Sequence, residues 1–302
     1  MQDIIIKISG QNLKVTHLDK IFFPKEKITK GEVIEYYRKI APFILPYLKD
    51  RPESLNRHPN GILGKNFFQK DFAYQPPNFV KTKKIFSESN DDYINFLVCE
   101  NILTLIYLAN LGCIEMNPWF STIKHLEKPD YAVIDLDPED ISFEKVVEIA
   151  LEVHNLLGKL KVPNFCKTSG ATGMHIYIPL GAKYTYDQAK EFSHLVAVLV
   201  NRKIPNITSV ERNPKKRQKK VYLDYLQNRK GQTLAAPYSL RPKPGAPVAT
   251  PLEWKEVKKG LSPSQFTIKT IFPRLKKKGD IFKGIFGKGI DLKKVLNLIE
   301  KL

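Results

Sequence analysis

The chain has 302 residues, of which 42% are hydrophobic and 26% are charged, and its formal net charge is +18. This is the composition of an ordinary globular protein, with no secretory signal at its start, no uninterrupted apolar window of membrane-spanning length, and three widely spaced cysteines that match neither a disulfide framework nor a zinc site. The positive charge favours a polyanionic partner, and two basic runs at residues 212–220 and 274–278 favour nucleic acid over an evenly lysine-rich surface.

Helical and extended patterns are mixed along the whole chain. The capping-box spacing of Thr29 and Glu32 predicts a helix that ends near Pro42, and a second helix is expected over residues 93–111. Turn and strand pieces are expected over residues 49–68, strands over 131–138 and 221–226, and a strand–turn–strand over 164–179. Further helices are expected over 142–158, 185–199 and 291–302, and five prolines predict an extended surface segment over 237–251. This mixture predicts an α+β (mixed α/β) fold without a linker-like break.

Acidic residues end one apolar run and interrupt another. In YAVIDLDPED (residues 131–140), a strand would point Asp135 and Asp137 to the same face, with Cα atoms about 6.6 Å apart. Two such carboxylates repel unless a cation lies between them, and a divalent metal would remove that conflict. The motif alone is a weak signal, because a simple strand-end turn at Asp137 and Pro138 explains it as well. Asp224 in VYLDY (residues 221–225) would complete the ligands for two Mg²⁺ or Mn²⁺ ions, unless it is an ordinary solvent-facing strand residue.

A glycine-bearing turn lies between the two acidic segments. In KTSGATGMHI (residues 167–176), glycines would let backbone N–H groups approach an anion, and Ser169 and His175 stand at the borders of the turn. Hydroxyl and imidazole donors suit a triphosphate. An ordinary hairpin with a half-buried His175 is the alternative.

These motifs, in this order, resemble the archaeo-eukaryotic primase superfamily and, more closely, the polymerase domain of DNA ligase D, an end-joining polymerase of bacteria and archaea. The resemblance covers nearly the whole chain, because it includes VTHLDKIFFP, ITKGEVIEYY, RHPNG with NFFQK, CIEMNPW and APYSLRPKPGAPVATPLEW. It implies one primase-polymerase catalytic domain over residues 1–302, with central sheets that carry the metal acids and helices that flank them. Within it we expect a DNA-end-binding lobe over about 1–125, a metal and nucleotide core over about 126–275, and a basic tail and helix over 276–302.

The resemblance also implies roles for individual residues. The catalytic metal-binding acids would be Asp135, Asp137 and Asp224, holding two Mn²⁺ or Mg²⁺ ions. Positions that match the nucleotide site are Ser169, His175, Arg217 and Arg241. Positions that match the grip on DNA and its 5′-phosphate are His17, Lys20, Lys30 and Arg57, with Phe67 and Phe68 stacking on template bases.

Three positions of the nucleotide site depart from the family pattern. Asn117 stands where many relatives have histidine, Thr172 where a lysine is usual, and Gln227 where an arginine is common. Each change lowers the positive or titratable character around the nucleotide, and nearby lysines such as Lys167 and Lys219 are candidates to compensate. We still expect catalysis, because the metal acids are intact.

The resemblance implies a metal-dependent, template-directed nucleotidyltransferase. It would add nucleotides, ribonucleotides by preference, at short gaps and at broken DNA ends with a 5′-phosphate during non-homologous end joining. We expect it in a prokaryotic cytoplasm, at the nucleoid and not at a membrane, with the end-binding protein Ku, a DNA ligase and a phosphoesterase as separate partners. Two alternatives are a catalytically weakened end-binding or synapsis module and a metal-dependent nuclease, although a nuclease gives no reason for the glycine-bearing turn.

Overall fold

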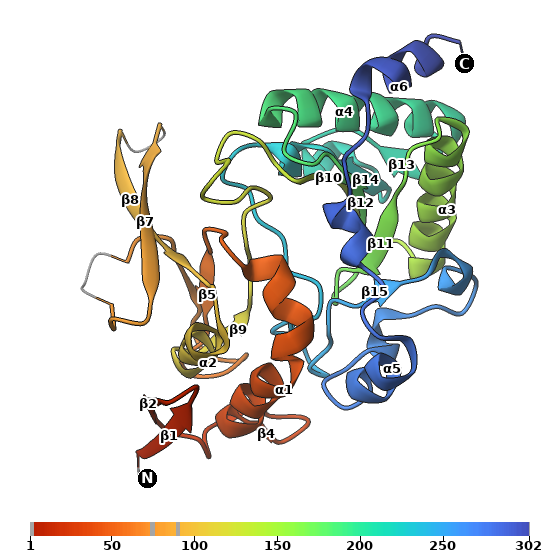
Figure 1. Ribbon diagram of the computed structural model, residues 1–302. Helices are drawn as coiled ribbons and strands as arrows, with labels where there is room; N and C mark the ends of the chain where they lie inside the picture. The colour runs from red at the N-terminus through yellow and green to blue at the C-terminus, as the bar shows by residue number, and fades with distance from the viewer. Residues whose placement is uncertain (1–2, 73–75, 89–90, 302) are drawn as a thin grey trace. The chain divides into compact units, whose positions relative to one another are not determined.

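The computed structural model describes residues 3–72, 76–88 and 91–301, and it has the expected mixed α+β fold (Figure 1). The chain divides into two compact units, each of which is described separately. Unit 1 comprises Met1–Lys124, Thr233–Ala249 and Phe266–Phe272, and unit 2 comprises His125–Gln232, Thr250–Gln265 and Pro273–Leu302. Each unit has its own buried apolar core, so two centres of packing are formed within this single chain.

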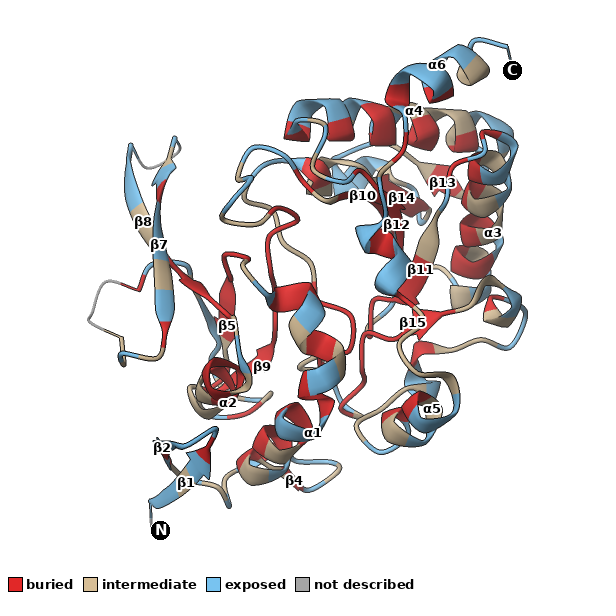
Figure 2. Ribbon diagram, in the orientation of Figure 1, coloured by how far each residue is buried: buried red, intermediate tan, exposed pale blue. Residues whose placement is uncertain are grey.

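Unit 2 is built on a six-stranded sheet in the order β13–β14–β10–β12–β11–β15. The strands are β10 (Tyr131–Pro138), β11 (Phe165–Thr168), β12 (Met174–Pro179), β13 (Thr208–Ser209), β14 (Val221–Asp224) and β15 (Pro251–Leu252). Neighbouring strands are antiparallel except for β13 and β14, which are parallel. Helices α3 (Phe143–Lys159) and α4 (Tyr186–Lys203) contact each other and the central strand β10 (Figure 1). Figure 2 shows the buried residues that line these strands and the inner sides of both helices.

Local signals in unit 2 begin its helices where the sequence predicts them. Thr185 and Gln188 form the expected capping box of α4, and Asp291 caps α6 (Leu292–Ile299). Ser142 precedes α3, but its side chain makes no capping hydrogen bond. The short 3₁₀ helices of this unit are η1 (Pro214–Lys216), η2 (Leu226–Asn228), η3 (Trp254–Glu256), η4 (Pro263–Gln265) and η5 (Lys283–Phe286). In sequence, α5 (Ile271–Lys278) spans the boundary between the two units.

Unit 1 combines two helices with small sheets. The helices are α1 (Lys30–Leu48) and α2 (Ile102–Asn110), and the three-stranded sheet has the order β6 (Phe67–Gln69), β5 (Leu55–Arg57), β9 (Cys113–Glu115). Among the described residues of this unit, β1 (Ile4–Ile8) pairs with β2 (Gln11–Val15), β3 (Ile21–Phe23) with β4 (Ile28–Thr29), and β7 (Lys81–Ser87) with β8 (Asp92–Val98). Helix α1 begins with the predicted capping box of Thr29 and Glu32.

Three sequence predictions about local structure are wrong, and tertiary packing explains each. Helix α1 continues through Pro42 and Pro46 to Leu48 because its buried apolar face outweighs the cost of about 3 kcal/mol that proline imposes inside a helix. Residues 93–98 form strand β8 instead of helix because they pair along their length with β7, and α2 begins only after its N-cap, Asn101. The proline-rich segment 237–251 is largely buried, because residues such as Tyr238 pair with Ala249 and fill the core instead of lying on the surface.

None of the helices in the described part of the chain is both long and apolar enough to span a membrane.

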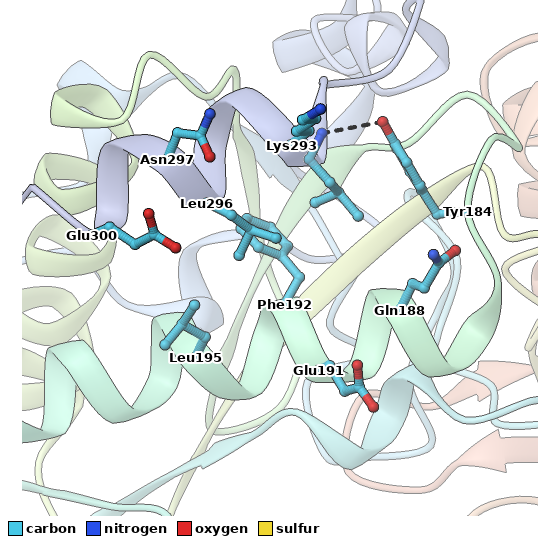
Figure 3. Close-up of a pocket in the computed structure, with 10 residues that line it drawn as sticks. Tyr184, Gln188, Glu191, Phe192, Leu195, Lys293, Leu296, Asn297 and Glu300 are labelled. Atoms are coloured by element: carbon cyan, nitrogen blue, oxygen red, sulfur yellow. Dashed lines mark hydrogen bonds between the residues drawn. The ribbon is translucent and has the colours of Figure 1, made fainter.

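A groove of about 570 Å³ lies between α4 and α6 (Figure 3). Its apolar lining includes Phe192, Leu195 and Leu296, and none of the predicted site residues lines it.

Candidate active site

The register of the six-stranded sheet places the predicted site residues of unit 2 in one row. Asp135 lies directly opposite Asp224 on β14 and directly opposite His175 on β12. On the next strand, Lys167 lies opposite His175. Directly opposed residues share a face of the sheet, with Cβ atoms about 4.5–5.5 Å apart. The row Asp224–Asp135–His175–Lys167 therefore crosses four strands on one face, and strand alternation puts Asp137 on that face too.

His175 and Lys167 are the buried members of this row. His175 is 3% exposed, and its Nε2 lies 3.4 Å from Oδ1 of Asp135. Lys167 is fully buried, and its Nζ donates to the Thr168 carbonyl oxygen at 3.4 Å. The candidate compensating charge of Lys167 thus lies on the same face as the acids. By contrast, Lys219 is exposed and pairs with Asp140 at 2.8 Å.

Asp137 is held by an arginine. Arg217 Nη1 lies 3.7 Å from Asp137 Oδ2, and its guanidinium lies 4.0 Å above the centre of the Tyr222 ring, which is directly opposite Asp137 in the ladder. Arg217 also donates through Nε and Nη2 to the carbonyl oxygens of Glu211 and Arg212. Partial desolvation raises the pKa of Asp137, Arg217 lowers it, and the neighbouring Asp224 raises it. Asp137 and Asp224 are therefore close enough to repel each other.

Asp224 is the last residue of β14, and the turn that follows holds its carboxylate. Oδ1 accepts from the Leu226 backbone N–H at 2.8 Å, and Oδ2 accepts from Gln227 Nε2 at 3.2 Å. The amide of Gln227, a residue expected at the nucleotide site, thus bonds one of the three acids.

The glycine-bearing turn between β11 and β12 is closed by Ser169. Its hydroxyl oxygen accepts from the backbone N–H groups of Ala171 and Gly173 at 3.1 and 3.0 Å. A Cβ at Gly173 would lie 2.1 Å from the Leu136 carbonyl oxygen, between Asp135 and Asp137 in the chain. Only glycine lets the turn approach the acidic strand this closely, and the departing residue Thr172 is exposed beside it.

The three aspartates do not converge in this conformation. In the ranges that the structure describes, no three His, Cys, Asp or Glu side chains are grouped closely enough to hold a metal ion. Asp137 faces Arg217, and Asp224 is bonded to its own turn. The backbone therefore brings the acids to adjacent positions while their side chains have other partners.

In unit 1, the predicted phosphate-gripping residues gather at the start of α1. Lys30 is its first residue and is 5% exposed, and its Nζ donates to the carbonyl oxygen and the hydroxyl of Thr16 at 2.7 and 3.2 Å. Burial lowers the pKa of Lys30 to about 8, and the nearby charge of Lys20 contributes to the shift. Lys20 donates to Asn60 Oδ1 at 2.5 Å, and His17 lies in the same turn with a positive φ of 55°. Two ammonium groups and a helix N-terminus thus lie together, a combination that suits an anion.

The predicted template-stacking residues lie on the three-stranded sheet of unit 1. Phe67 and Phe68 on β6 are 46% and 63% exposed, which is unusual for rings of this size. Arg57 on β5 lies 5.2 Å from the Phe67 ring centre and donates to Gln69 Oε1 at 3.0 Å. The two rings are therefore open surfaces and not part of the core.

The remaining two nucleotide-site candidates also lie in unit 1. Arg241 Nε donates to Glu115 Oε2 at 2.5 Å, and Glu115 is 8% exposed. Asn117 is 4% exposed, its carbonyl accepts from the Ser54 N–H, and its Nδ2 makes no hydrogen bond with any residue that the structure describes. Sequence reasoning missed Glu115, although a glutamate within the apolar CIEMNPW segment was a visible signal.

Comparison with known proteins identifies the family. The family described as "LigD, primase-polymerase domain" matches residues 29–282. The chain belongs to the LigD primase-polymerase domain family.

Similar proteins agree with this assignment. The chain is 38% identical over 269 residues to the bifunctional non-homologous end joining protein LigD of Bacillus subtilis, covering 88% of this chain and 43% of that protein. It is 30% identical over 265 residues to the multifunctional LigD of Pseudomonas aeruginosa, covering 87% of this chain and 31% of that protein. The chain thus spans less than half the length of these relatives.

A solved structure confirms the fold. The polymerase domain of Mycobacterium tuberculosis ligase D, solved in complex with DNA, superposes with a TM-score of 0.85 at 25% identity, covering 93% of this chain and all of that one. The expected mixed α+β fold with a central sheet is therefore confirmed, as is the resemblance on which the site residues were assigned. As a LigD primase-polymerase domain, the chain is a polymerase-type enzyme domain, and metal dependence is implied by its family.

Proposed function

We propose that this LigD primase-polymerase domain is a template-directed nucleotidyltransferase that extends primer 3′ ends at short gaps and broken DNA ends. Its substrates would be DNA with a 5′-phosphate downstream and nucleoside triphosphates, with ribonucleotides preferred by resemblance to the family. It would act in non-homologous end joining at the nucleoid of a prokaryotic cell, with Ku, a ligase and a phosphoesterase supplied by other polypeptides or other domains. The reaction forms a bond between the primer 3′ oxygen and the α-phosphorus, and pyrophosphate leaves.

The observation that carries this proposal is the direct opposition of Asp135 and Asp224 in the ladder, with Asp137 two residues further along β10. Like charges directly opposed on a sheet are destabilising, so such an arrangement needs a reason. Binding of divalent cations supplies one, because carboxylate oxygens are the ligands that hard cations prefer. The donor set fits Mg²⁺ or Mn²⁺, and two such ions would supply activation of the 3′-hydroxyl and charge neutralisation at the departing pyrophosphate.

The chain's own residues would orient the triphosphate. The Ser169 hydroxyl oxygen accepts from two backbone N–H groups, which holds the turn in shape beside the acids, and His175 Nε2 lies 3.4 Å from Asp135. The Ser169 hydroxyl and the His175 imidazole are the groups proposed to donate to the triphosphate, because preorganised donors stabilise the negative charge that develops in phosphoryl transfer. The buried Lys167 places its amino group on the same face, and a protonated Lys167 would support triphosphate binding despite the threonine at position 172.

DNA binding is proposed for unit 1. The DNA complex of the Mycobacterium tuberculosis domain supports this role by similarity, and so do the grouped lysines Lys20 and Lys30 and the open rings of Phe67 and Phe68. Ammonium groups would hold the 5′-phosphate, and the rings would stack on template bases without reading their sequence.

A second candidate is an end-binding module with weakened catalysis. It is favoured by the engagement of Asp137 with Arg217 and by the absence of a ready metal group among the described residues, together with Asn117 and Thr172. Such a module would bind 5′-phosphorylated ends without extending them.

Primer extension on a gapped duplex separates the two candidates. The wild-type chain should add nucleotides in the presence of Mn²⁺ or Mg²⁺, with more incorporation when the downstream strand carries a 5′-phosphate. Asp137→Ala should abolish extension while leaving DNA-end binding unchanged. Tight end binding without any incorporation by the wild type would instead favour the module, and primer shortening without added nucleotide would indicate a nuclease. Parallel reactions with NTPs and dNTPs test the proposed sugar preference.

A further inference from the structure

Asn228 joins the turn after Asp224 to the strand that carries Asp135. Its side chain is fully buried. The amide oxygen accepts from the Val133 backbone N–H at 2.8 Å, and Nδ2 donates to the Val133 carbonyl oxygen at 2.7 Å. A side chain that both donates to and accepts from one residue reproduces the pair of hydrogen bonds that an antiparallel strand neighbour would make.

The Asn228 amide takes the place of a strand neighbour at the point where β14 ends. The ladder between β10 and β14 runs from Pro138 opposite Val221 to Asp135 opposite Asp224, after which the chain leaves the sheet as η2. Val133 lies two residues before Asp135, so Asn228 occupies the next hydrogen-bonded step of the ladder. Nδ2 also donates to the Tyr225 carbonyl oxygen at 3.0 Å, which closes the turn. Asp224 is thus restrained on both sides along its strand.

The other contacts of the turn do not provide this restraint. The hydrogen bonds from Leu226 and Gln227 to the Asp224 carboxylate come from the same turn and would move with it. The Tyr225 ring stacks on His194 of α4 with centroids 4.2 Å apart, which orients the ring without bonding β10. Asn228 lies after the last residue of β14, and its side chain makes the two hydrogen bonds that join this turn to Val133 of β10.

We propose that Asn228 is a positioning residue that fixes the Asp224 carboxylate beside Asp135 and thereby sets the affinity of the acidic site for divalent cations. This inference rests on the proposed function. Without the Asn228 amide, the end of β14 would separate from β10, and two buried backbone groups of Val133 would lose their partners. A cation needs oxygen ligands at fixed positions, so the site would bind it more weakly even in a folded protein.

The test measures Mn²⁺ binding to the whole chain in the absence of nucleotide and DNA. The electron paramagnetic resonance signal of free Mn²⁺ reports how much of the ion is unbound. Asn228→Ala should raise the Mn²⁺ dissociation constant by about 10-fold or more, as expected when a group that orients a metal ligand is removed. Asn228→Ser is the milder second variant for the case in which the alanine variant does not fold. Asp224→Ala identifies the signal that belongs to the acidic site.

Asn164→Ala is the matched control. Asn164 lies in the same unit, and its side chain also bonds a backbone carbonyl, that of Val162 at 2.9 Å, and a neighbouring ring, that of His154 at 2.8 Å. Its loss should lower the melting temperature and leave the Mn²⁺ affinity within about twofold of wild type, because it lies outside the row of acids. High Mn²⁺ concentrations should restore primer extension by Asn228→Ala but not by Asp224→Ala.

The outcomes separate the inference from the proposed function. Wild-type Mn²⁺ affinity in a folded Asn228 variant, or equal weakening by Asn164→Ala, overturns the positioning role while the polymerase proposal stands. If Asp224→Ala binds Mn²⁺ as tightly as the wild type does, the metal site itself is overturned, and the inference falls with it.

Discussion

The proposed binding of a DNA 5′-phosphate by Lys30 is expected to weaken as the pH rises through about 8. Lys30 is 5% exposed, and burial together with the nearby charge of Lys20 lowers its pKa to about 8. Two of its three ammonium donors go to Thr16, which leaves one for a ligand. Since only the charged form attracts a phosphate strongly, deprotonation removes this contribution.

The size of the effect follows from the lowered pKa. With a pKa of about 8, Lys30 is about nine-tenths protonated at pH 7 and about one-tenth at pH 9. Affinity for the 5′-phosphate should therefore fall about tenfold between these pH values, or about 1.4 kcal/mol. The phosphate itself stays dianionic, because its second pKa is about 6. Deprotonation of Lys30 does not destabilise the fold as the pH rises. Between pH 8 and about 10.5 the unfolded chain binds more protons at Lys30 than the folded protein does, so the contribution of this group to folding stability rises with pH.

The assay compares fluorescence anisotropy of gapped DNA with and without the 5′-phosphate at pH 7, 8 and 9 and constant ionic strength. The ratio of the two affinities isolates the phosphate contribution from general DNA binding. Lys30→Met should make this ratio independent of pH, and Lys20→Met should move the midpoint upwards because a neighbouring positive charge is removed. A wild-type ratio that does not change with pH, or a dependence that survives in Lys30→Met, would refute the reasoning.

Three further substitutions test other parts of the site. Gly173→Ala should lower the free energy of unfolding by about 1–3 kcal/mol in chemical denaturation, because its Cβ would lie 2.1 Å from the Leu136 carbonyl oxygen. The control is Gly158→Ala, whose Cβ would meet nothing within 4 Å and which should cause no loss of stability. Equal losses in the two variants would contradict the steric argument. Phe68→Ala should change the free energy of unfolding by less than about 0.5 kcal/mol, because the ring is 63% exposed. The same variant should bind a single-stranded overhang more weakly by about 1–3 kcal/mol. An unchanged affinity in fluorescence anisotropy would count against stacking. Thr172→Lys should lower the KM for nucleotide at unchanged kcat by adding a positive charge to the turn, an expectation that a raised KM would disprove.

The sequence predicted those parts of the fold that depend on local signals. Capping boxes at Thr29 and Thr185 begin α1 and α4 as expected, and the alternation of β10 places Asp135 and Asp137 on one face. The end of α1 could not be predicted in this way. The burial that carries it past Pro42 depends on residues far away in the chain, and local rules see only the cost of the proline.

The pairing of distant residues is what the sequence alone could not provide. A resemblance to a known family named Asp224 as the third acid, but its position directly opposite Asp135 depends on the register between two strands about 90 residues apart. Neither spacing nor periodicity encodes that register, because a shift of one residue would turn Asp224 to the other face while leaving the pattern of VYLDY unchanged. Side chains such as Asn228, whose amide bonds Val133 after β14 has ended, contribute contacts to this pairing that no local pattern shows. In a sequence, an asparagine after a strand looks like an ordinary turn residue. Its contribution to the site becomes visible only in the structure, where Val133, 95 residues away, donates one hydrogen bond to the Asn228 amide and accepts another from it.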